Sequence, residues 1–354
     1  MRQPAKPTIR DVAAKAGVSI ATVSRVLNGS PLATKEMKSR VHAAIAVTGF
    51  RPNRIGSQLK SASSRMIGIM VPALSNPVFA DAVHGVESEA ESSGYAVIVS
   101  SSDYRPDREA ACVDALLAYR VAGLVLTVAD AGRSPTLRTL EREKIPYVLM
   151  FNQPAKTARP AVTVDNVAAA AEAVRHLIAF GHRRVAMVAG SFESSDRSRL
   201  RHYGFEGALA EAGLEAGPVI EVGFDEVELT GHLTNLFARS DAPTALFCST
   251  DLLAIAAIGC LKRIGRRVPE DVSVIGFDGI AIAEVMTPRL TTVAQPSRQM
   301  GAEAVRLLLS RLAGQRAASR RILPHTLRAG ETVAVPRRAE ITVLSTALQK
   351  GRSR

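Results

Sequence analysis

Apolar residues in the first fifty positions recur at the spacing of short helices. Thr8 precedes one such stripe, and Asp11 stands where a variant of the capping box places an acidic side chain. Gly17 suits the end of that helix, because glycine tolerates the left-handed conformation of a C-cap, and Ser19 can cap a second helix. The pattern therefore predicts a helix, a tight turn and a second helix. The inward-facing stripes are Ile9, Val12, Ala13 and Ala16, followed by Val23, Val26 and Leu27.

A third helix is expected to begin after Thr34, another residue type that favours helix N-caps. Gly49 followed by Phe50 matches a helix end that is closed by a glycine and a hydrophobic contact. The inward stripe of this helix is Met37, Val41, Ala44 and Ile45. Three such helices can enclose a small core of their own, so we expect an independent domain over residues 7–50.

From Met66 onward, short strand-like apolar runs alternate with segments of helical period. This alternation is typical of βαβ units and a parallel sheet, and it occurs twice, so two α/β lobes are expected. The predicted strands of the first lobe are 67–71, 96–99, 123–127 and 147–150, with helices near 77–92, 106–119 and 135–143. Those of the second lobe are 185–188, 219–222, 245–247 and 272–275, with helices near 167–180, 198–212, 227–238 and 251–264.

The predicted fold class is an N-terminal all-α helix-turn-helix head followed by an α/β body of two parallel-sheet lobes. Parallel sheets bind ligands beyond the carboxyl ends of their strands. Two lobes that face each other would therefore enclose a cleft for a small molecule.

Charge is unevenly distributed along the chain. Residues 1–65 hold twelve Lys or Arg side chains and two acidic ones, a net formal charge of +10, whereas residues 66–336 sum to −2. A basic terminus is often a solvated tail, but such a tail should lack the apolar periodicity of this segment. We therefore expect a folded module that binds a polyanion such as nucleic acid. Residues 339–354 are expected to form a basic C-terminal tail.

The remaining composition argues against several classes of protein. Cys112, Cys248 and Cys260 lack metal-ligand spacing and are too few for a disulfide framework, so we interpret them as buried thiols. The first thirty residues contain no continuous apolar stretch like that of a signal peptide, and no later run approaches a membrane span. These features predict a soluble cytoplasmic protein with no metal site and no cofactor.

The segment TIRDVAAKAGVSIATVSRVLN, from Thr8 to Asn28, resembles the DNA-binding head of the lactose and galactose repressor family without a gap. In that family the second helix enters the major groove of an operator, and hinge helices from two subunits wedge leucines into the minor groove. Residues 51–64 resemble this hinge helix and its linker. The residues that the resemblance implicates in DNA binding are Thr8, Ser19, Ile20, Ala21, Thr22, Ser24, Arg25, Asn28, Asn53, Leu59 and Lys60.

The resemblance also implies different roles for these positions. Base reading falls on Ile20, Ala21 and Arg25, and the wedge on Leu59. The place of Ile20 is commonly polar or basic in the family, and isoleucine offers only apolar contact, for example to a thymine methyl group. The resemblance therefore does not carry over which base is read there.

The body, residues 66–338, is similar to the effector domain of the same family, which has the type I periplasmic-binding-protein fold. In that fold the chain returns to the first lobe after Thr291, which implies a first lobe of about 66–162 and 293–322. The second lobe then spans about 163–291 and 323–338. The residues that the resemblance implicates in effector binding are Phe79, Asn152, Arg201, Phe224, Thr250 and Asp278.

The chemistry of these residues indicates a sugar or a sugar acid as the effector. The Arg201 guanidinium suits a carboxylate or paired hydroxyls, and the Asn152 amide offers a donor and an acceptor to vicinal hydroxyls. Asp278 can accept from hydroxyl groups, although it could instead cap a helix. A phenylalanine such as Phe79 can stack on a sugar ring or simply begin a helix core.

Two neighbouring features qualify this interpretation. Phe151 stands where the family commonly has an acidic residue, so direct sugar contact there is in question. Arg197 and Arg199 precede Arg201 in a charge run, and we expect these two to lie on a solvated face, as most charge runs do.

The sequence contains no motif for catalysis. A Gly-x-Ser-x-Gly elbow, a Walker loop, a Gly-x-Gly-x-x-Gly after a strand and a His-x-x-x-His pair beside a glutamate are all absent. We therefore expect a non-enzymatic, sequence-specific transcription regulator that acts as an effector-controlled repressor.

Two alternatives remain open. A purine-type corepressed regulator is one, and a solute-binding protein of the transport type, from a different functional class, is the other. The basic head and the missing export signal disfavour the second. A homodimer is the default assembly, because residues 339–354 lack the long leucine heptads of a tetramer zipper.

Overall fold

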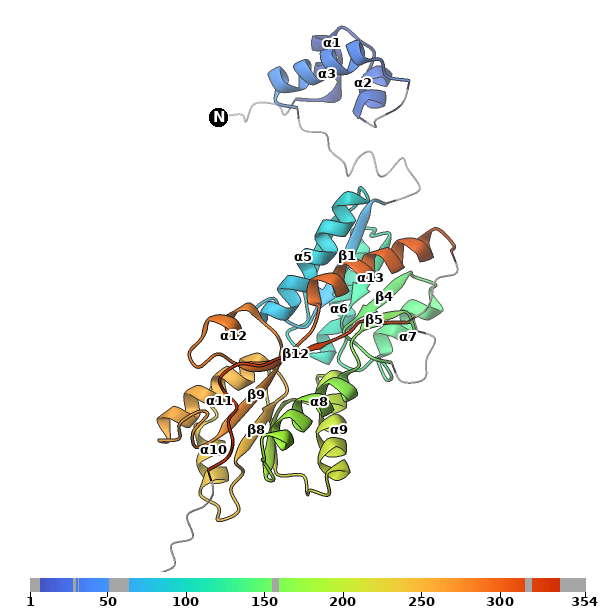
Figure 1. Cartoon of the computed structure of the whole chain (residues 1–354). Helices are drawn as coiled ribbons and strands as arrows, with labels where there is room; N and C mark the ends of the chain where they lie inside the picture. Colours follow the sequence, from blue (N-terminus) through green and yellow to red (C-terminus); the bar gives the residue numbers. More distant parts are fainter. Residues whose placement is uncertain are drawn as a thin grey trace, which may run out of the picture. The chain divides into compact units, whose positions relative to one another are not determined.

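The computed structural model describes residues 7–27, 30, 32–50, 64–154, 159–315 and 320–337. The chain divides into two compact units, Met1–Ser64 and Arg65–Arg354, each of which has its own hydrophobic core. In the described ranges the first unit is helical and the second holds two six-stranded sheets with helices around them (Figure 1). The predicted fold class is therefore confirmed.

The head contains α1 (Ile9–Ala16), α2 (Ile20–Leu27) and α3 (Lys35–Thr48). The backbone N–H and the hydroxyl of Thr8 donate to one Asp11 carboxylate oxygen, at 2.7 and 2.8 Å. Gly17 ends α1 in the left-handed region, at φ 62°. Ser19 begins α2, because its Oγ accepts from the Thr22 N–H at 3.1 Å. The predicted caps and turn are thus present.

The core of the head follows the predicted stripes with one exception. Val12, Val23 and Val41 are fully buried where the three helices meet. Met37, which we expected to face inward, is 37% exposed, because the buried face of α3 begins one turn later at Val41. The sequence pattern did not predict the role of Arg40, whose guanidinium donates to two carbonyls at the end of α1 and satisfies groups that a helix end leaves unpaired.

The first lobe is built on a parallel sheet with strand order β11-β5-β4-β3-β1-β2. Its strands are β1 (Met66–Val71), β2 (Ala96–Ser101), β3 (Gly123–Leu126), β4 (Tyr147–Met150), β5 (Ala161–Thr163) and β11 (Arg320–Ile322). Its helices are α5 (Pro77–Ser92), η1 (Pro106–Arg108), α6 (Glu109–Ala118), α7 (Pro135–Arg142) and α13 (Ser297–Leu312).

The second lobe repeats this plan with strand order β12-β10-β9-β8-β6-β7, in which β12 alone runs antiparallel to its neighbour. Its strands are β6 (Val185–Gly190), β7 (Val219–Val222), β8 (Ala245–Cys248), β9 (Ser273–Asp278), β10 (Thr291–Ala294) and β12 (Thr326–Arg328). Its helices are α8 (Asn166–Ala179), α9 (Asp196–Glu211), α10 (Thr230–Phe237), α11 (Asp251–Arg263) and α12 (Ala281–Val285).

The chain crosses between the lobes slightly later than we expected. Thr163 still belongs to the first sheet and Ala294 to the second, because β5 pairs with β4 and β10 pairs with β9. The expected boundaries at residues 162 and 293 are therefore wrong by one or two residues. After Ala294 the chain returns to the first lobe, where α13 lies beside α5 (Figure 1), and β12 then goes back to the second sheet.

The helices α5 and α13 cross closely because each has a glycine at the contact. A Cβ added to Gly301 would lie 2.0 Å from the Ala82 carbonyl oxygen, and one added to Gly85 would lie 2.0 Å from the Arg298 carbonyl oxygen. Neither position can carry a side chain unless the helices move apart. The helix that returns from the second lobe is thus fixed to the first by backbone-to-backbone packing.

We predict that Gly301→Ala lowers the free energy of unfolding by about 1 to 3 kcal/mol, because the new methyl group overlaps a backbone carbonyl. Gly207→Ala, in the exposed part of α9, is the control: no atom lies within 4 Å of its Cβ position, and alanine favours helices more than glycine. Urea denaturation of both variants measures the effect. Equal stability of the two variants would contradict the packing argument.

Candidate functional site

The outer surface of α2 carries the residues that the resemblance implicates in base reading. Ala21 and Arg25 are exposed, and Ile20 is 45% exposed although it is a large apolar residue. Ser19 is exposed, and its hydroxyl is hydrogen-bonded to the half-buried Thr22 hydroxyl at 2.9 Å. A short helix therefore presents a guanidinium, hydroxyls and small apolar groups together, a combination that fits the major groove.

The other predicted DNA-binding residues either have limited exposure or a prior hydrogen bond, or lie outside the described residues. Ser24 is half-buried in α2, and Thr8 is exposed but its hydroxyl is used by the α1 cap. Asn28, Asn53, Leu59 and Lys60 lie outside the described residues.

The cleft between the two lobes is closed in this structure. It leaves a cavity of about 20 Å³, which is room for about one water molecule. Five of the six predicted effector residues line this cavity: Phe79, Arg201, Phe224, Thr250 and Asp278. They come from the carboxyl ends of strands and the starts of helices in both lobes, where parallel sheets bind ligands.

Aromatic rings from both lobes line the cavity. Tyr104, after β2, stacks on Phe224, after β7, with ring centroids 4.1 Å apart and an interplanar angle of 5°. Phe79 contacts Phe151 edge-on at 5.1 Å. Phe224 fits because residue 190 is glycine: a Cβ at Gly190 would lie 2.4 Å from its ring.

Arg201 is buried and held by the second lobe from several directions. Its guanidinium donates to the Asn166 side chain at 3.0 Å and to the Ser249 carbonyl, and it lies 3.6 Å from the centre of the Phe277 ring. It also approaches the Asp278 carboxylate at 3.4 Å. Burial lowers the pKa of Arg201 to about 10, so the group stays charged at neutral pH.

Asp278 does not cap a helix, which was the alternative explanation for it. Its carboxylate accepts from the Gln295 amide at 2.8 Å and faces Arg201. Its backbone φ is 125°, a conformation that is strained for a residue with a side chain, and such strain is concentrated at functional sites. Phe151, at the end of the matching strand of the first lobe, also has a positive φ, of 69°.

Asn152 does not line the cavity, so its predicted contact with effector hydroxyls is not supported in this closed arrangement. The side chain is fully buried, its oxygen accepts from the Val128 N–H at 2.9 Å, and its amide nitrogen donates to the Val128 carbonyl and to Asp196. Both amide hydrogens are thus used, one within the first lobe and one across to Asp196 of the second. The sequence alone does not show that Asp196 approaches this amide from the other lobe.

Asp196, the first residue of α9, connects the two lobes. Its carboxylate accepts from the Asn152 amide and the Ala131 N–H, each at 2.9 Å, and its own N–H donates to the Ala129 carbonyl at 2.6 Å. Burial raises the pKa of Asp196. We call this set of contacts the Asp196 contact.

The two arginines that we expected on a solvated face both take part in the closed cleft. Arg197 is 4% exposed and lines the cavity, and its Nη1 donates to the Val128 carbonyl at 2.8 Å. Arg199 is half-buried and pairs with Asp130 of the first lobe at 2.7 Å. That expectation is therefore wrong, because both side chains reach across to the first lobe.

Sequence reasoning also missed other residues that line the cavity. Tyr104 and Gln295 lie in irregular segments after β2 and β10, where periodicity carries no signal. Arg197 could have been found, because residues four apart share a helix face and Arg197 stands four positions before Arg201.

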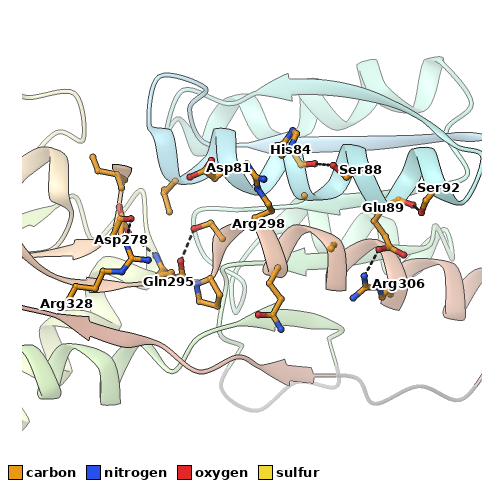
Figure 2. Close-up of a pocket in the computed structure, with 18 residues that line it drawn as sticks. Asp81, His84, Ser88, Glu89, Ser92, Asp278, Gln295, Arg298, Arg306 and Arg328 are labelled. Carbon is orange, nitrogen blue, oxygen red and sulfur yellow. Dashed lines mark hydrogen bonds and ion pairs between the residues drawn. The ribbon is translucent and has the colours of Figure 1, made fainter. Parts of the chain in front are cut away.

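A larger open groove of about 840 Å³ runs along α5 and α13 (Figure 2). Polar groups such as Asp81, His84 and Arg298 line its length, and an ion pair between Arg306 and Glu89, at 2.6 Å, lies at its outer end. Asp278 lines both this groove and the closed cavity, as do Val78 and Gln295. The groove therefore leads to one wall of the cavity.

Within the described ranges, no cluster of His, Cys, Asp and Glu side chains could hold a metal ion, and no helix is long and apolar enough to span a membrane. The head and the two-lobed body together define a DNA-binding regulator with a ligand-binding domain. Comparison with known proteins identifies its family.

Residues 8–53 match the model of bacterial regulatory proteins of the lacI family, and residues 174–333 match a periplasmic binding protein-like domain. The chain is 34% identical to the HTH-type transcriptional repressor CytR of Escherichia coli K12, over 90% of this chain and 93% of that protein. It is similar in structure to a lac repressor dimer bound to operator and an anti-inducer, with a TM-score of 0.83, 27% identity and coverage of 93% and 100%. A complex of the transcriptional regulator CelR with cellobiose matches with a TM-score of 0.68 at 30% identity, covering 92% of this chain and 99% of that one.

The chain belongs to the lacI family of DNA-binding transcription regulators. The relatives found are regulators and not enzymes, as the absence of catalytic motifs predicted.

Buried carboxyl groups give the body a predictable dependence on pH. Burial raises the pKa of Glu109 to about 7, and it raises the pKa of Asp278 to about 7 as well. Glu109 is 4% exposed and accepts from the Ala129 N–H at 2.6 Å, in the loop that contacts Asp196. The folded state therefore binds a proton more tightly than the unfolded chain. The stability that this proton supplies is complete below the unfolded pKa and is lost as the pH rises through about 7.

We predict that Glu109→Gln, which cannot ionise, gains stability relative to the wild type by about 1 to 3 kcal/mol between pH 5 and pH 8. Urea denaturation at a series of pH values measures this difference. Glu143→Gln, at a surface position that is 51% exposed, is the control and should change little with pH. A constant difference between Glu109→Gln and the wild type would show that Glu109 does not carry the shifted pKa.

Proposed function

We propose that this protein is a transcriptional repressor that binds a partly palindromic operator as a homodimer in the cytoplasm and is controlled by a sugar or a sugar acid. The single observation that carries the effector part is the closed cleft between the lobes, where a buried guanidinium and carboxylate meet aromatic rings. The DNA-binding part rests on the outer surface of α2.

Operator recognition places α2 in the major groove. Ile20, Ala21 and Arg25 contact base edges, with Arg25 donating to a guanine and Ile20 packing against a thymine methyl group. Phosphate or sugar contacts fall on Ser19, Thr22, Ser24 and Asn28. The exposure of Arg25, Ala21 and Ile20 supports this assignment.

Dimerisation places two heads on the two halves of the operator. The hinge residues Asn53, Leu59 and Lys60 enter the proposal through the resemblance, with Leu59 as the minor-groove wedge.

The effector lies between Arg201 and Asp278 on one side and the rings of Phe79 and Phe224 on the other, with Thr250 nearby. A guanidinium and a carboxylate together can bind hydroxyl groups or a carboxylate, and rings pack on the apolar face of a sugar. The relative that forms a cellobiose complex supports a carbohydrate ligand. A nucleobase is the second candidate, because the Tyr104 and Phe224 rings, which are stacked on each other here, could stack on a flat heterocycle once they separate.

Control follows from the two-lobed body. Effector binding changes the contacts that hold the lobes together, and the changed lobes favour or disfavour the paired hinge segments. Effector affinity and operator affinity are then coupled by the same free energy in both directions.

We predict that Arg25→Ala weakens binding to the selected operator by about 1 to 3 kcal/mol and relaxes preference at one base pair. Selection from random oligonucleotides followed by fluorescence anisotropy measures both effects. Lys38→Ala removes an exposed charge from α3 and is the control, which should leave base preference unchanged. Unaltered base selection by Arg25→Ala would refute the groove assignment.

We predict that Asp278→Ala keeps operator affinity but loses the response to effector. A thermal-shift panel of sugars, sugar acids and nucleobases on the full chain first identifies the effector, because a bound ligand raises the melting temperature. Calorimetry then compares wild type and variant. Normal effector affinity of Asp278→Ala would show that the effector binds elsewhere.

A further inference from the structure

One terminal nitrogen of the Arg197 guanidinium is hydrogen-bonded and the other is not. Nη1 donates to the Val128 carbonyl at 2.8 Å and to the Asp196 carboxylate at 3.2 Å. Nη2 is buried and has no hydrogen-bond partner among the residues that the structure describes. The Arg197 side chain lines the closed cavity, and Nη2 is one of its two terminal nitrogens.

A buried donor of this kind calls for an explanation. Buried polar groups in native proteins are nearly always hydrogen-bonded, and a charged donor is more costly to leave unpaired than a neutral one. The cross-lobe contact of Nη1 fixes the position of the guanidinium, so Nη2 cannot turn to solvent. Nη2 can therefore donate to a partner that the described part of the chain does not supply.

The charges around the cavity favour an anionic partner. Three charged residues line it, namely Arg197, Arg201 and Asp278. Asp278 is paired with Arg201 and accepts from Gln295, so Arg197 has no carboxylate partner within the lining; its ion pair, at 3.2 Å, is with Asp196. Asp196 offsets part of the Arg197 charge, but it is not part of the lining and its oxygens already accept from Asn152 and Ala131.

The position of Arg197 adds to this preference. It is the second residue of α9, a helix that spans Asp196–Glu211, and Ser195 caps that helix beside the cavity. The N-terminus of a helix carries a partial positive charge and favours anions. Arg197 and the start of α9 therefore lie at the same wall of the cavity.

We propose that Arg197 binds an anionic group of the effector, so that the effector is an acidic sugar derivative carrying a carboxylate or a phosphate. This rests on the proposed effector site between the lobes and specifies its ligand class. Arg197 and Arg201, four residues apart, contact the acidic group and the hydroxyls respectively. Because the cavity holds only about 20 Å³, the Tyr104 and Phe224 rings separate to admit the ligand.

Titration calorimetry on the full chain tests this with matched pairs of compounds. Glucuronate, galacturonate and gluconate supply the carboxylate, glucose 6-phosphate supplies the phosphate, and glucose and galactose are the uncharged counterparts. We expect one acidic compound to bind at least about tenfold more tightly than its uncharged counterpart, as a charge-assisted hydrogen bond requires. The acid that binds distinguishes a carboxylate from a phosphate.

Variants of α9 then locate the contact. Arg197→Gln should lose at least about tenfold in affinity for the acid and little for an uncharged sugar, because only the acid needs the charge. Arg199→Gln is the matched control: it also removes a positive charge from α9 and a contact with the first lobe, but Arg199 does not line the cavity. Arg197→Lys keeps the charge and should retain part of the preference for the acid.

The outcomes separate this proposal from the proposed function. Binding of uncharged compounds alone, or equal acid affinity in wild type and Arg197→Gln, overturns the anionic site and leaves the sensor function in place. An equal loss for acid and uncharged sugar in Arg197→Gln also overturns it, since the contact would then be a neutral hydrogen bond. If no compound of either kind binds, both proposals fail. Unchanged operator affinity shows that each variant is folded. If Arg197→Gln does not fold, the affinity of Arg197→Lys for the acid and for the uncharged sugar tests the proposal instead.

Discussion

The Asp196 contact is the interaction on which the closed form of the body depends. A carboxylate at the first position of α9 reaches across the cleft and accepts from the Asn152 amide and the Ala131 N–H. The charge is buried, and burial raises its pKa, so these hydrogen bonds and the neighbouring Arg197 must compensate for lost hydration. Removing any of these partners leaves a buried polar or charged group without compensation. The contacts of Asp196 therefore form or break together when the lobes close or open.

The first residues of α9 make both the contacts that close the lobes and the proposed contacts with the ligand. Asp196 and Arg199 bind the first lobe, whereas Arg197 and Arg201 line the cavity. A ligand that engages the second pair therefore acts on the element that holds the lobes together. This arrangement is a physical basis for coupling between effector and operator, because the ligand need only alter contacts that already bridge the lobes.

Much of the fold could be predicted from periodicity, because caps, glycine helix ends and alternating apolar runs act locally. Each of the eight strands expected from apolar runs is present. The sequence pattern missed β5, β11 and β12, which span only three residues, and β10, which begins with two threonines. The resemblance placed five effector residues on the cavity. It did not anticipate that Asn152 pairs with Asp196 of the other lobe, or that Arg197 is buried with a contact to the first lobe. Local sequence does not encode contacts that form only when two separate sheets meet.

The most direct test of this account is amide hydrogen exchange of Ala131 and Asp196 in the full chain, because both N–H groups donate across the cleft. In the wild type both should exchange slowly, and in Asn152→Ala both should exchange at least about tenfold faster as the lobes open more often, while amides inside β8 keep their protection. Equal protection of the two amides in wild type and variant would show that the Asp196 contact does not hold the cleft closed.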